Sequence, residues 1–216
     1  LHGRVTRLFF TPLVRALRQL LGPVEFLRFL DSFRYPLSGE FAFMRSLAKS
    51  IRISPTWGLE ISLLGEVFDH TTVARVCQVE IADTYHHKHQ QLSQDNPQAG
   101  LVRMATDIGT TLFGILAKGG AVLSQPLFDS LLAGYLRYAR IAIEQYNALA
   151  QINGLVYERH EEIEAVEVFV QCLRTAQESF RADPIGAPLM SAWVRVRSAI
   201  PDFLTRLQAA VDRENA

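Results

Sequence analysis

The second half of the chain is built from long segments with helical periodicity, and this constrains the fold more than any other feature. After Pro97, apolar residues recur three or four positions apart, the spacing that gives a helix one buried face. The predicted helices cover roughly 98–117, 126–151, 157–181 and 188–212. Asn153-Gly154 and the stretch from Asp183 to Pro188 separate them, and we expect Pro201 to kink the last one. The pattern therefore favours a predominantly helical protein.

Residues 1 to about 95 mix helical and extended patterns. The stretch "RVTRLFFTPLVRALRQLLG" predicts a helix that Pro12 kinks or restarts and that Gly22-Pro23 ends. Residues 32–45, "SFRYPLSGEFAFMR", suit a strand bent at a turn, and the alternation in "RVCQVEIAD" (75–83) predicts a half-buried strand. Between them, residues 54–70 predict a loop that leads into a helix, with Ile61, Leu64 and Phe68 on one face.

These patterns indicate an α+β fold that is predominantly helical. Because the architecture changes near residue 95, we expect a domain or subdomain junction there, dividing residues 1–95 from a helical subdomain over 96–216. The chain begins with Leu1 rather than Met, and we expect it to be a fragment from which an upstream part has been removed.

Charge and hydropathy limit the kinds of partner. Lys plus Arg number 22 and Asp plus Glu number 22, so no overall field attracts nucleic acid, and we expect no nucleic-acid partner. The most apolar stretch, 108–128, is interrupted by Lys118, Gly119-Gly120 and Pro126, so we expect no stable membrane insertion. The two cysteines form no disulfide framework, and a reducing, cytoplasmic location fits them.

Three of the six histidines lie within four positions, in "ADTYHHKHQQL" (82–92). If the preceding strand continues, His87 and His89 share one face and His86 points the other way, so the three cannot converge on one ion. A divalent ion at a phosphate centre also needs carboxylates, and the chain contains no Asp-x-Asp. Two readings stay open: solvated histidines at a strand end, or one histidine that completes a metal site with carboxylates from outside this chain.

Four segments together resemble the glucosyl-3-phosphoglycerate synthases and the related mannosyl-3-phosphoglycerate synthases, which are retaining GT-A glycosyltransferases. The segments are "GRVTRL" (3–8), "YPLSGEFA" (35–42), "WGLEISLL" (57–64) and "QVEIADTYHHKHQ" (78–90). The resemblance implies transfer of a hexose from a nucleoside diphosphate hexose to 3-phosphoglycerate, which makes a compatible-solute precursor. It further implies the C-terminal half of a GT-A (Rossmann-like) fold, with residues 1–95 as the acceptor-binding remainder of the catalytic domain.

The resemblance also implies site residues. Gly3, Arg4, Val5 and Thr6 match the acceptor-binding segment, where a helix N-terminus and a guanidinium would hold an anion. The Leu37 backbone would lie beside the reacting sugar.

The other two segments supply the donor and metal residues. Glu60 would hydrogen-bond the hexose hydroxyls, Trp57 would line that pocket and Lys88 would contact the sugar nucleotide. His87 would bind Mg²⁺ or Mn²⁺ together with an Asp-x-Asp expected upstream of this chain, and His89 would contact the acceptor. His89 stands where the mycobacterial pattern has asparagine, and Tyr85 where it has arginine. We expect the fragment alone to be inactive.

Alternatives to this assignment come from other parts of the chain. Residues 96–216 could form a non-catalytic helical oligomerisation module derived from a glycosyltransferase, and their apolar helices favour a homodimer. A weaker reading is a peripheral membrane enzyme with Arg4, Arg7, Arg15 and Arg18 facing anionic lipid. In "YERHEEIEAVE" (157–167), we interpret the glutamates as a solvated helix face without a site. We interpret the Tyr and Arg residues of 135–146 as core and rim packing.

Overall fold

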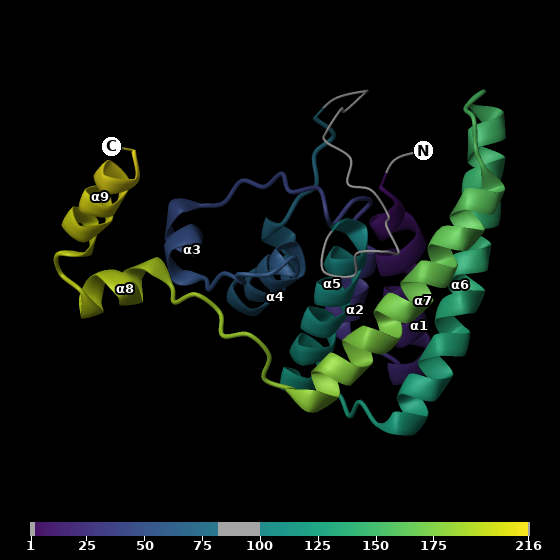
Figure 1. The fold of residues 1–216 in the computed structure, drawn as a ribbon, viewed down its shortest axis with the longest axis horizontal. Helices are drawn as coiled ribbons and strands as arrows, with labels where there is room; N and C mark the ends of the chain where they lie inside the picture. Colours follow the sequence, from purple (N-terminus) through teal and green to yellow (C-terminus); the bar gives the residue numbers. More distant parts are fainter. Residues whose placement is uncertain (1–2, 82–99, 216) are drawn as a thin grey trace.

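A computed structural model describes residues 3–81 and 100–215. Three long helices, α5 (Gly100–Lys118), α6 (Gln125–Ile152) and α7 (Arg159–Ala182), pack against the N-terminal helices η1 (Val5–Phe10) and α1 (Thr11–Leu21). Helix α2 (Glu25–Asp31) packs on α1, and α4 (Leu59–His70) packs on α5 and α2. The short helices α3 (Arg45–Ser50) and η2 (Val73–Arg75) lie in the connecting segments. Figure 1 shows α8 (Trp193–Ala199) and α9 (Phe203–Glu214) as an arm that reaches away from this bundle beyond α3.

The N-terminal helix forms where the sequence predicts it and begins with a wider turn. Residues Val5–Phe10 form a π-helix, and every one of them is buried. Pro12 lies in the first turn of α1, directly after the π-helix, and the chain changes there to regular α-helical geometry without a break. Gly22 ends α1 with a φ of +75°, a conformation that glycine adopts without steric cost. The predicted helix and its stop at Gly22-Pro23 are confirmed.

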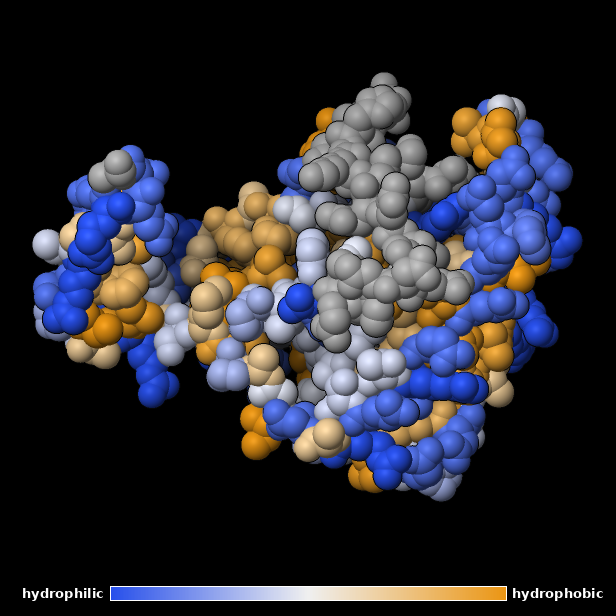
Figure 2. Space-filling view, viewed as in Figure 1, coloured by the Kyte–Doolittle hydropathy of each residue, from blue (hydrophilic) through white to orange (hydrophobic). Residues whose placement is uncertain are grey.

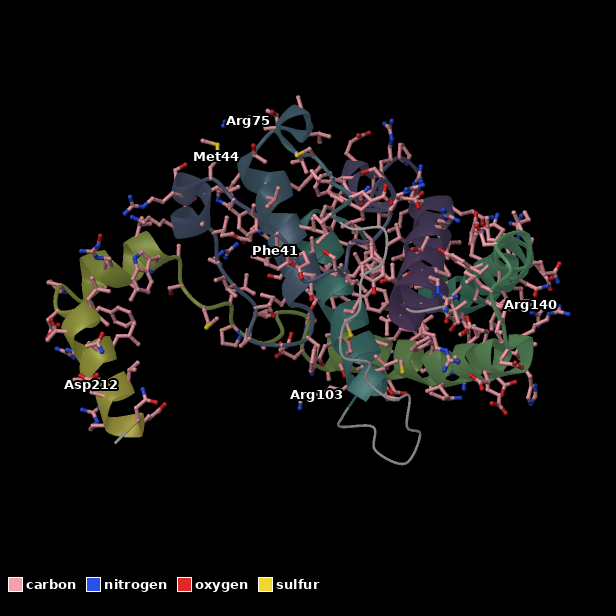
Figure 3. All side chains as sticks on the ribbon, turned by 90° about the horizontal axis from the view of Figure 1, so that it is seen from above. Phe41, Met44, Arg75, Arg103, Arg140 and Asp212 are labelled. Atoms are coloured by element: carbon pink, nitrogen blue, oxygen red, sulfur yellow. The ribbon has the colours of Figure 1, made fainter. Side chains whose placement is uncertain are left out.

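Aromatic side chains at the crossing of these helices fill the core. The ring centroid of Phe9 lies 6.0 Å from that of Tyr135 on α6 and 5.5 Å from that of Phe169 on α7. Tyr135 is fully buried, and its hydroxyl donates to the carbonyl of Leu8 at 2.9 Å. In contrast, Arg140 on the same helix is exposed and projects outward (Figure 3). The interpretation of residues 135–146 as core and rim packing is therefore confirmed.

Helices α5, α6 and α7 lie close to their predicted bounds. The prediction of one last helix over 188–212 is wrong. In place of one kinked helix over 188–212, two short helices, α8 and α9, are separated by residues 200–202. Pro201 lacks the N–H that a continuous helix needs and its ring clashes with the preceding turn, which explains the full break. The apolar side chains of α9 that recur at helical spacing stay 43 to 47% exposed: Leu204, Leu207 and Val211. Apolar surface on the arm is visible in Figure 2.

Both predicted strands are wrong over the residues that the structure describes. Residues 32–44 are irregular, and the segment from Val76 to Ile81 forms neither helix nor paired strand. Val79 is 70% exposed and Ile81 64% exposed, so the alternation does not produce a half-buried face. Within 3–81 and 100–215, the β-pairing is a single antiparallel bridge between Ile53 and Met190. An extended segment needs a neighbouring edge for its N–H and C=O groups, and these segments have no such neighbour in the described chain.

The region before the expected junction near residue 95 shares a core with the region after it. Leu17, Phe26 and Leu37 belong to the same buried cluster as Leu112 and Phe169. The junction itself lies outside the described residues, and the division into 1–95 and 96–216 stays a prediction. By length and composition, α5 is the one described helix that could cross a membrane. Ile108, Leu112 and Phe113 of this helix are completely buried in the bundle.

The two cysteines should differ sharply in reactivity. Cys77 is exposed, whereas Cys172 is 2% exposed and burial raises the pKa of its thiol to about 11. Since the thiolate is the nucleophile, a thiol reagent at pH 8 should modify Cys77 quickly and Cys172 only after unfolding. Intact-mass measurement with and without urea checks this. Two rapid modifications in the native protein would contradict the packing of α5 on α7.

Glu66 should make the fold sensitive to acid. This carboxylate is 4% exposed and accepts from the Arg52 backbone N–H at 2.9 Å and from Arg52 Nη2 at 2.6 Å. Burial alone would raise its pKa, but the hydrogen bonds from Arg52 outweigh burial and lower it. Its stabilisation is therefore complete above the ordinary glutamate pKa of about 4.3 and is lost as the pH falls through the lowered value.

Glu66→Gln should lower the free energy of unfolding by about 1–3 kcal/mol at pH 7, with the difference shrinking below about pH 4. Urea unfolding at several pH values measures this. Glu178→Gln, an exposed glutamate on α7, is the matched control and should change nothing. A pH-independent difference between Glu66→Gln and the wild type would refute the assignment.

Candidate functional site

Three of the four segments that carry the family resemblance meet in space. Gly3 has a φ of +74°, and a Cβ placed on it would lie 2.7 Å from Cε2 of Tyr35. The side-chain oxygen of Gln78 accepts from the backbone N–H of Arg34 at 2.7 Å and, at 3.5 Å, from that of Tyr35. The positive φ at position 3 favours glycine, and the absence of a side chain lets the Tyr35 ring approach closely. Gly3, Tyr35 and Gln78, one residue from each of these three segments, are thus neighbours.

The predicted acceptor residues begin the first helix, and their side chains have different surroundings. Val5 is 4% exposed and Thr6 3% exposed, so both side chains belong to the protein interior. The first N–H groups of a helix lack intrahelical acceptors, so the backbone of this segment can still offer donors to an anion. Arg4 is partly exposed, and its guanidinium is the cationic group at the surface of the segment.

Two glutamates from α7 already contact the Arg4 guanidinium. Arg4 Nε donates to Glu162 Oε1 at 2.9 Å, and Arg4 Nη2 donates to Glu161 Oε2 at 2.5 Å. Burial opposes the charged form of Arg4, but these hydrogen bonds outweigh it and raise its pKa. Arg4 is therefore permanently charged, and α7 rather than a neighbouring residue in sequence sets its position.

Glu162 also binds Arg7, which lies in the interior. Arg7 is 6% exposed, and its Nη1 donates to Glu162 Oε2 at 2.8 Å. Burial alone would raise the pKa of Glu162, but Arg7 and then Arg4 lower it overall. The Arg7 guanidinium lies 4.8 Å from the ring centroid of Tyr146. Burial, together with the negative charge of Glu162, raises the pKa of Tyr157 to about 12. Our interpretation of Glu162 as part of a solvated helix face is therefore wrong.

Glu164, in contrast, lies on the solvated face of α7 that the sequence predicts. His160 Nε2 lies 3.3 Å from Glu164 Oε1, and both side chains are exposed. The sequence did contain a signal for Glu162, because Ala165, Val166 and Phe169 follow it at helical spacing and are buried. Periodicity thus places this glutamate on the apolar stripe of α7, where a carboxylate needs a cationic partner.

The fourth segment packs against α5. The backbone N–H of Trp57 donates to Asp107 Oδ2 at 3.1 Å, while the indole is 43% exposed. A Cβ on Gly58 would lie 2.0 Å from Oγ1 of Thr111, so only glycine allows this approach of α4 to α5. Glu60 follows in the first turn of α4, and burial raises its pKa. No other described side chain hydrogen-bonds or ion-pairs with Glu60, so its carboxylate is available to a ligand.

A groove of about 590 Å³ between α5 and α7 adjoins this segment. Asp107 belongs both to the groove and to the contact with Trp57, and Arg103 lies one helical turn before it. Figure 3 shows Arg103 reaching outward near the beginning of α5. Sequence patterns did not reveal Asp107, because an acidic residue in a helix ordinarily faces solvent.

The remaining predicted residues have different outcomes. Leu37 is 7% exposed and packs in the core, which leaves its backbone as the part that a sugar could reach. His87, Lys88 and His89 lie outside the described residues. Across 3–81 and 100–215, no group of three or more metal-ligating side chains exists, so the described residues alone do not fit a Mg²⁺ or Mn²⁺ site. The roles of all ten predicted site residues stay predictions.

Comparison with known proteins agrees with the motifs. No family model and no solved structure matches the chain. The chain is 59% identical over all 216 residues to the glucosyl-3-phosphoglycerate synthase of Persephonella marina, covering 53% of that protein. It is 40% identical over 214 residues to the synthase of the same name from Methanococcoides burtonii, covering 51% of it. The synthase of Mycobacterium tuberculosis is 39% identical over 84 residues.

The chain therefore spans about half the length of the curated relatives that it matches from end to end. Its identity to them extends through the helical region as well as through the four motifs. The absence of a matching solved structure leaves the GT-A architecture a prediction. The predicted resemblance is confirmed: over its whole length, this chain is related to about half of a glucosyl-3-phosphoglycerate synthase.

Proposed function

We propose that this chain is the acceptor-binding part of a retaining glycosyltransferase that transfers a hexose from a nucleoside diphosphate hexose to 3-phosphoglycerate. The observation that carries the proposal is the 59% identity to a glucosyl-3-phosphoglycerate synthase across every residue of the chain. The convergence of residues 3–8, 35–42 and 78–81 supports it, because residues that bind one substrate must share a surface. The name of that relative favours glucose as the hexose.

Arg4 and the N–H groups that begin η1 are proposed to bind the anionic acceptor. A carboxylate or phosphate is well matched to a guanidinium and to helix N–H donors, and both lie on one short segment here. Because the pKa of Arg4 is raised, its charge is constant over the physiological pH range.

The donor sugar is proposed to bind between Glu60, Trp57 and the backbone of Leu37. The Glu60 carboxylate lacks a described partner, and the adjacent indole offers an apolar face to a sugar ring. Asp107 would hold the segment by its hydrogen bond to the Trp57 backbone, and the buried contact of Gly58 with Thr111 fixes its distance from α5. The chain itself thus supplies groups that orient the sugar.

In the proposed reaction, the acceptor hydroxyl attacks the anomeric carbon from the face that the diphosphate leaves. A bond forms between the acceptor oxygen and the anomeric carbon, the bond to the diphosphate oxygen breaks, and the hydroxyl proton passes to the departing phosphate. A divalent metal would stabilise the diphosphate charge, and we propose that His87 and an upstream Asp-x-Asp bind it.

A second candidate is the non-catalytic helical module. The observation that favours it is the arm of α8 and α9, whose Leu204, Leu207 and Val211 stay 43 to 47% exposed. Such a face could contribute to the homodimer that we propose. A cytoplasmic location also remains part of the proposal.

The intact gene product that contains this chain should transfer glucose to 3-phosphoglycerate in the presence of Mg²⁺, with the anomeric configuration retained. Product formation is measured by mass spectrometry and its configuration by NMR. Residues 1–216 alone should show no transfer, because the expected Asp-x-Asp is absent from them. An intact protein that transfers no hexose to 3-phosphoglycerate would favour the helical module instead.

Glu60→Gln should reduce kcat/KM for the nucleotide sugar by about 10- to 100-fold, since a hydrogen bond to a charged group is lost in the transition state. Because the pKa of Glu60 is raised, its carboxylate becomes protonated at a higher pH than an ordinary glutamate does. On acidification, kcat/KM of the wild type should therefore begin to fall at that higher pH. This acid limb should vanish in Glu60→Gln. Glu25→Gln, an exposed first-turn glutamate of α2, serves as the control. An unchanged kcat/KM for Glu60→Gln would exclude its contact with the sugar.

A further inference from the structure

Among the described residues, two arginines and two glutamates at the start of η1 form a cluster with equal numbers of positive and negative charges. Arg4 and Arg7 contribute two positive charges, and Glu161 and Glu162 contribute two negative charges. The arginines come from η1 and its N-terminal end, whereas the glutamates come from the first turn of α7. An anionic ligand that approaches Arg4 therefore meets a guanidinium that is already neutralised.

The two glutamates differ in burial and in what they hold. Glu162 has 5% of its side chain exposed and bridges Arg4 Nε and Arg7 Nη1 with its two oxygens, at 2.9 and 2.8 Å. Releasing this carboxylate would break the hydrogen bond from Nη1 of Arg7, which is itself buried, and separating a buried ion pair is costly. Glu162 is therefore a fixed part of the cluster in every state of the folded protein.

Glu161 lies on the solvent side of the same guanidinium. Its side chain is 57% exposed, and its one contact with the cluster is Oε2 to Arg4 Nη2 at 2.5 Å. An exposed ion pair of this kind contributes little free energy, because water solvates both partners after they separate. A second carboxylate or a phosphate can replace Glu161 at Nη2 without disturbing Glu162.

We infer that Glu162 is a positioning residue that holds Arg4 toward the acceptor and that Glu161 is an exchangeable counter-ion which the anionic acceptor displaces. This inference rests on the proposed role of Arg4 in acceptor binding. The exchange favours acceptors that bring an anion, because a neutral acceptor gains nothing that offsets the loss of Glu161. Specificity for an anionic three-carbon acid then depends on α7 as well as on the "GRVT" segment.

The alignments to the mycobacterial relatives are too short to include both Arg4 and Glu162. Arg4 and Glu162 are 158 positions apart, whereas the alignments to the synthases of Mycobacterium tuberculosis and Mycolicibacterium smegmatis cover 84 and 129 residues. The alignment to Persephonella marina covers all 216 residues and therefore includes both positions. A relative that aligns over the whole chain can therefore share the ion pair between Arg4 and Glu162 of α7.

Steady-state kinetics on the intact gene product, with 3-phosphoglycerate as the varied substrate, tests the inference. Glu161→Gln should lower KM for 3-phosphoglycerate by about twofold to fivefold, the size of a lost surface ion pair. Glu162→Gln should raise that KM by about tenfold, because Arg4 loses its fixed orientation. In both variants kcat should change by less than about twofold, since the groups around the hexose are untouched. Glu164→Gln, one turn further on the exposed face, is the matched control.

Two further measurements keep the inference decidable. In an Arg4→Gln background, Glu161→Gln should have no effect on KM, because Glu161 acts through Arg4. If Glu162→Gln does not fold, as judged by circular dichroism, the Glu161→Gln result decides alone. An unchanged or raised KM in Glu161→Gln overturns the inference while leaving the proposed function intact. A wild-type protein that transfers no hexose overturns the proposed function itself.

Discussion

The contact of Phe9 with three helices is the constraint on which the rest of this structure depends. Its ring packs on Tyr135 of α6 and Phe169 of α7, and a Cβ on Gly109 of α5 would come within 3.5 Å of it. Phe9 follows the "GRVT" segment by three residues, so its burial fixes where that segment begins. The surface that we propose for the acceptor is consequently held by residues more than 100 positions away in sequence. A local loop could not provide this rigidity, because its backbone would have to be ordered without a buried core.

Close approach between the helices makes this constraint strict. On Gly109 a Cβ would lie 2.9 Å from the Cβ of Ala176, and on Gly134 it would lie 3.3 Å from that of Ala16. These small residues let α5 approach α7 and let α6 approach α1 closely. Such contacts leave little freedom for sliding, since interiors are packed at the density of organic crystals. The ion cluster of Arg4, Arg7, Glu161 and Glu162 then forms at one end of a rigid interface.

Periodicity predicted the helical part of the fold well, because each long helix buries a stripe that its own sequence encodes. The bounds of α5, α6 and α7 agree with the expected ranges to within a few residues. Strands are different, since a strand needs a partner edge that local sequence cannot supply. Residues 75–81 alternate correctly but have no edge beside them in the described chain.

Site prediction divides in the same way. Motifs identified Gly3, Arg4, Trp57 and Glu60 as candidates. The structure places Gly3 beside Tyr35 and joins the Trp57 backbone to Asp107 of α5. The motifs could not find Asp107 or Glu162, because their contacts depend on which helices become neighbours. For Glu162 alone, the sequence carried a signal of burial, because this residue lies on the apolar stripe of α7. That its partner is Arg7 could not be read from the sequence.

The π-helical geometry of Val5–Phe10 bears on how this end of the helix tolerates insertions and deletions. A π-turn contains one residue more than a regular helical turn, and each of its residues turns the chain by less than the about 100° of an α-helical residue. The extra residue is therefore absorbed within the turn, and the segments before and after it keep their orientation. In evolutionary terms, the gain or loss of a single codon within this turn can leave both Arg4 beside α7 and Phe9 in the core.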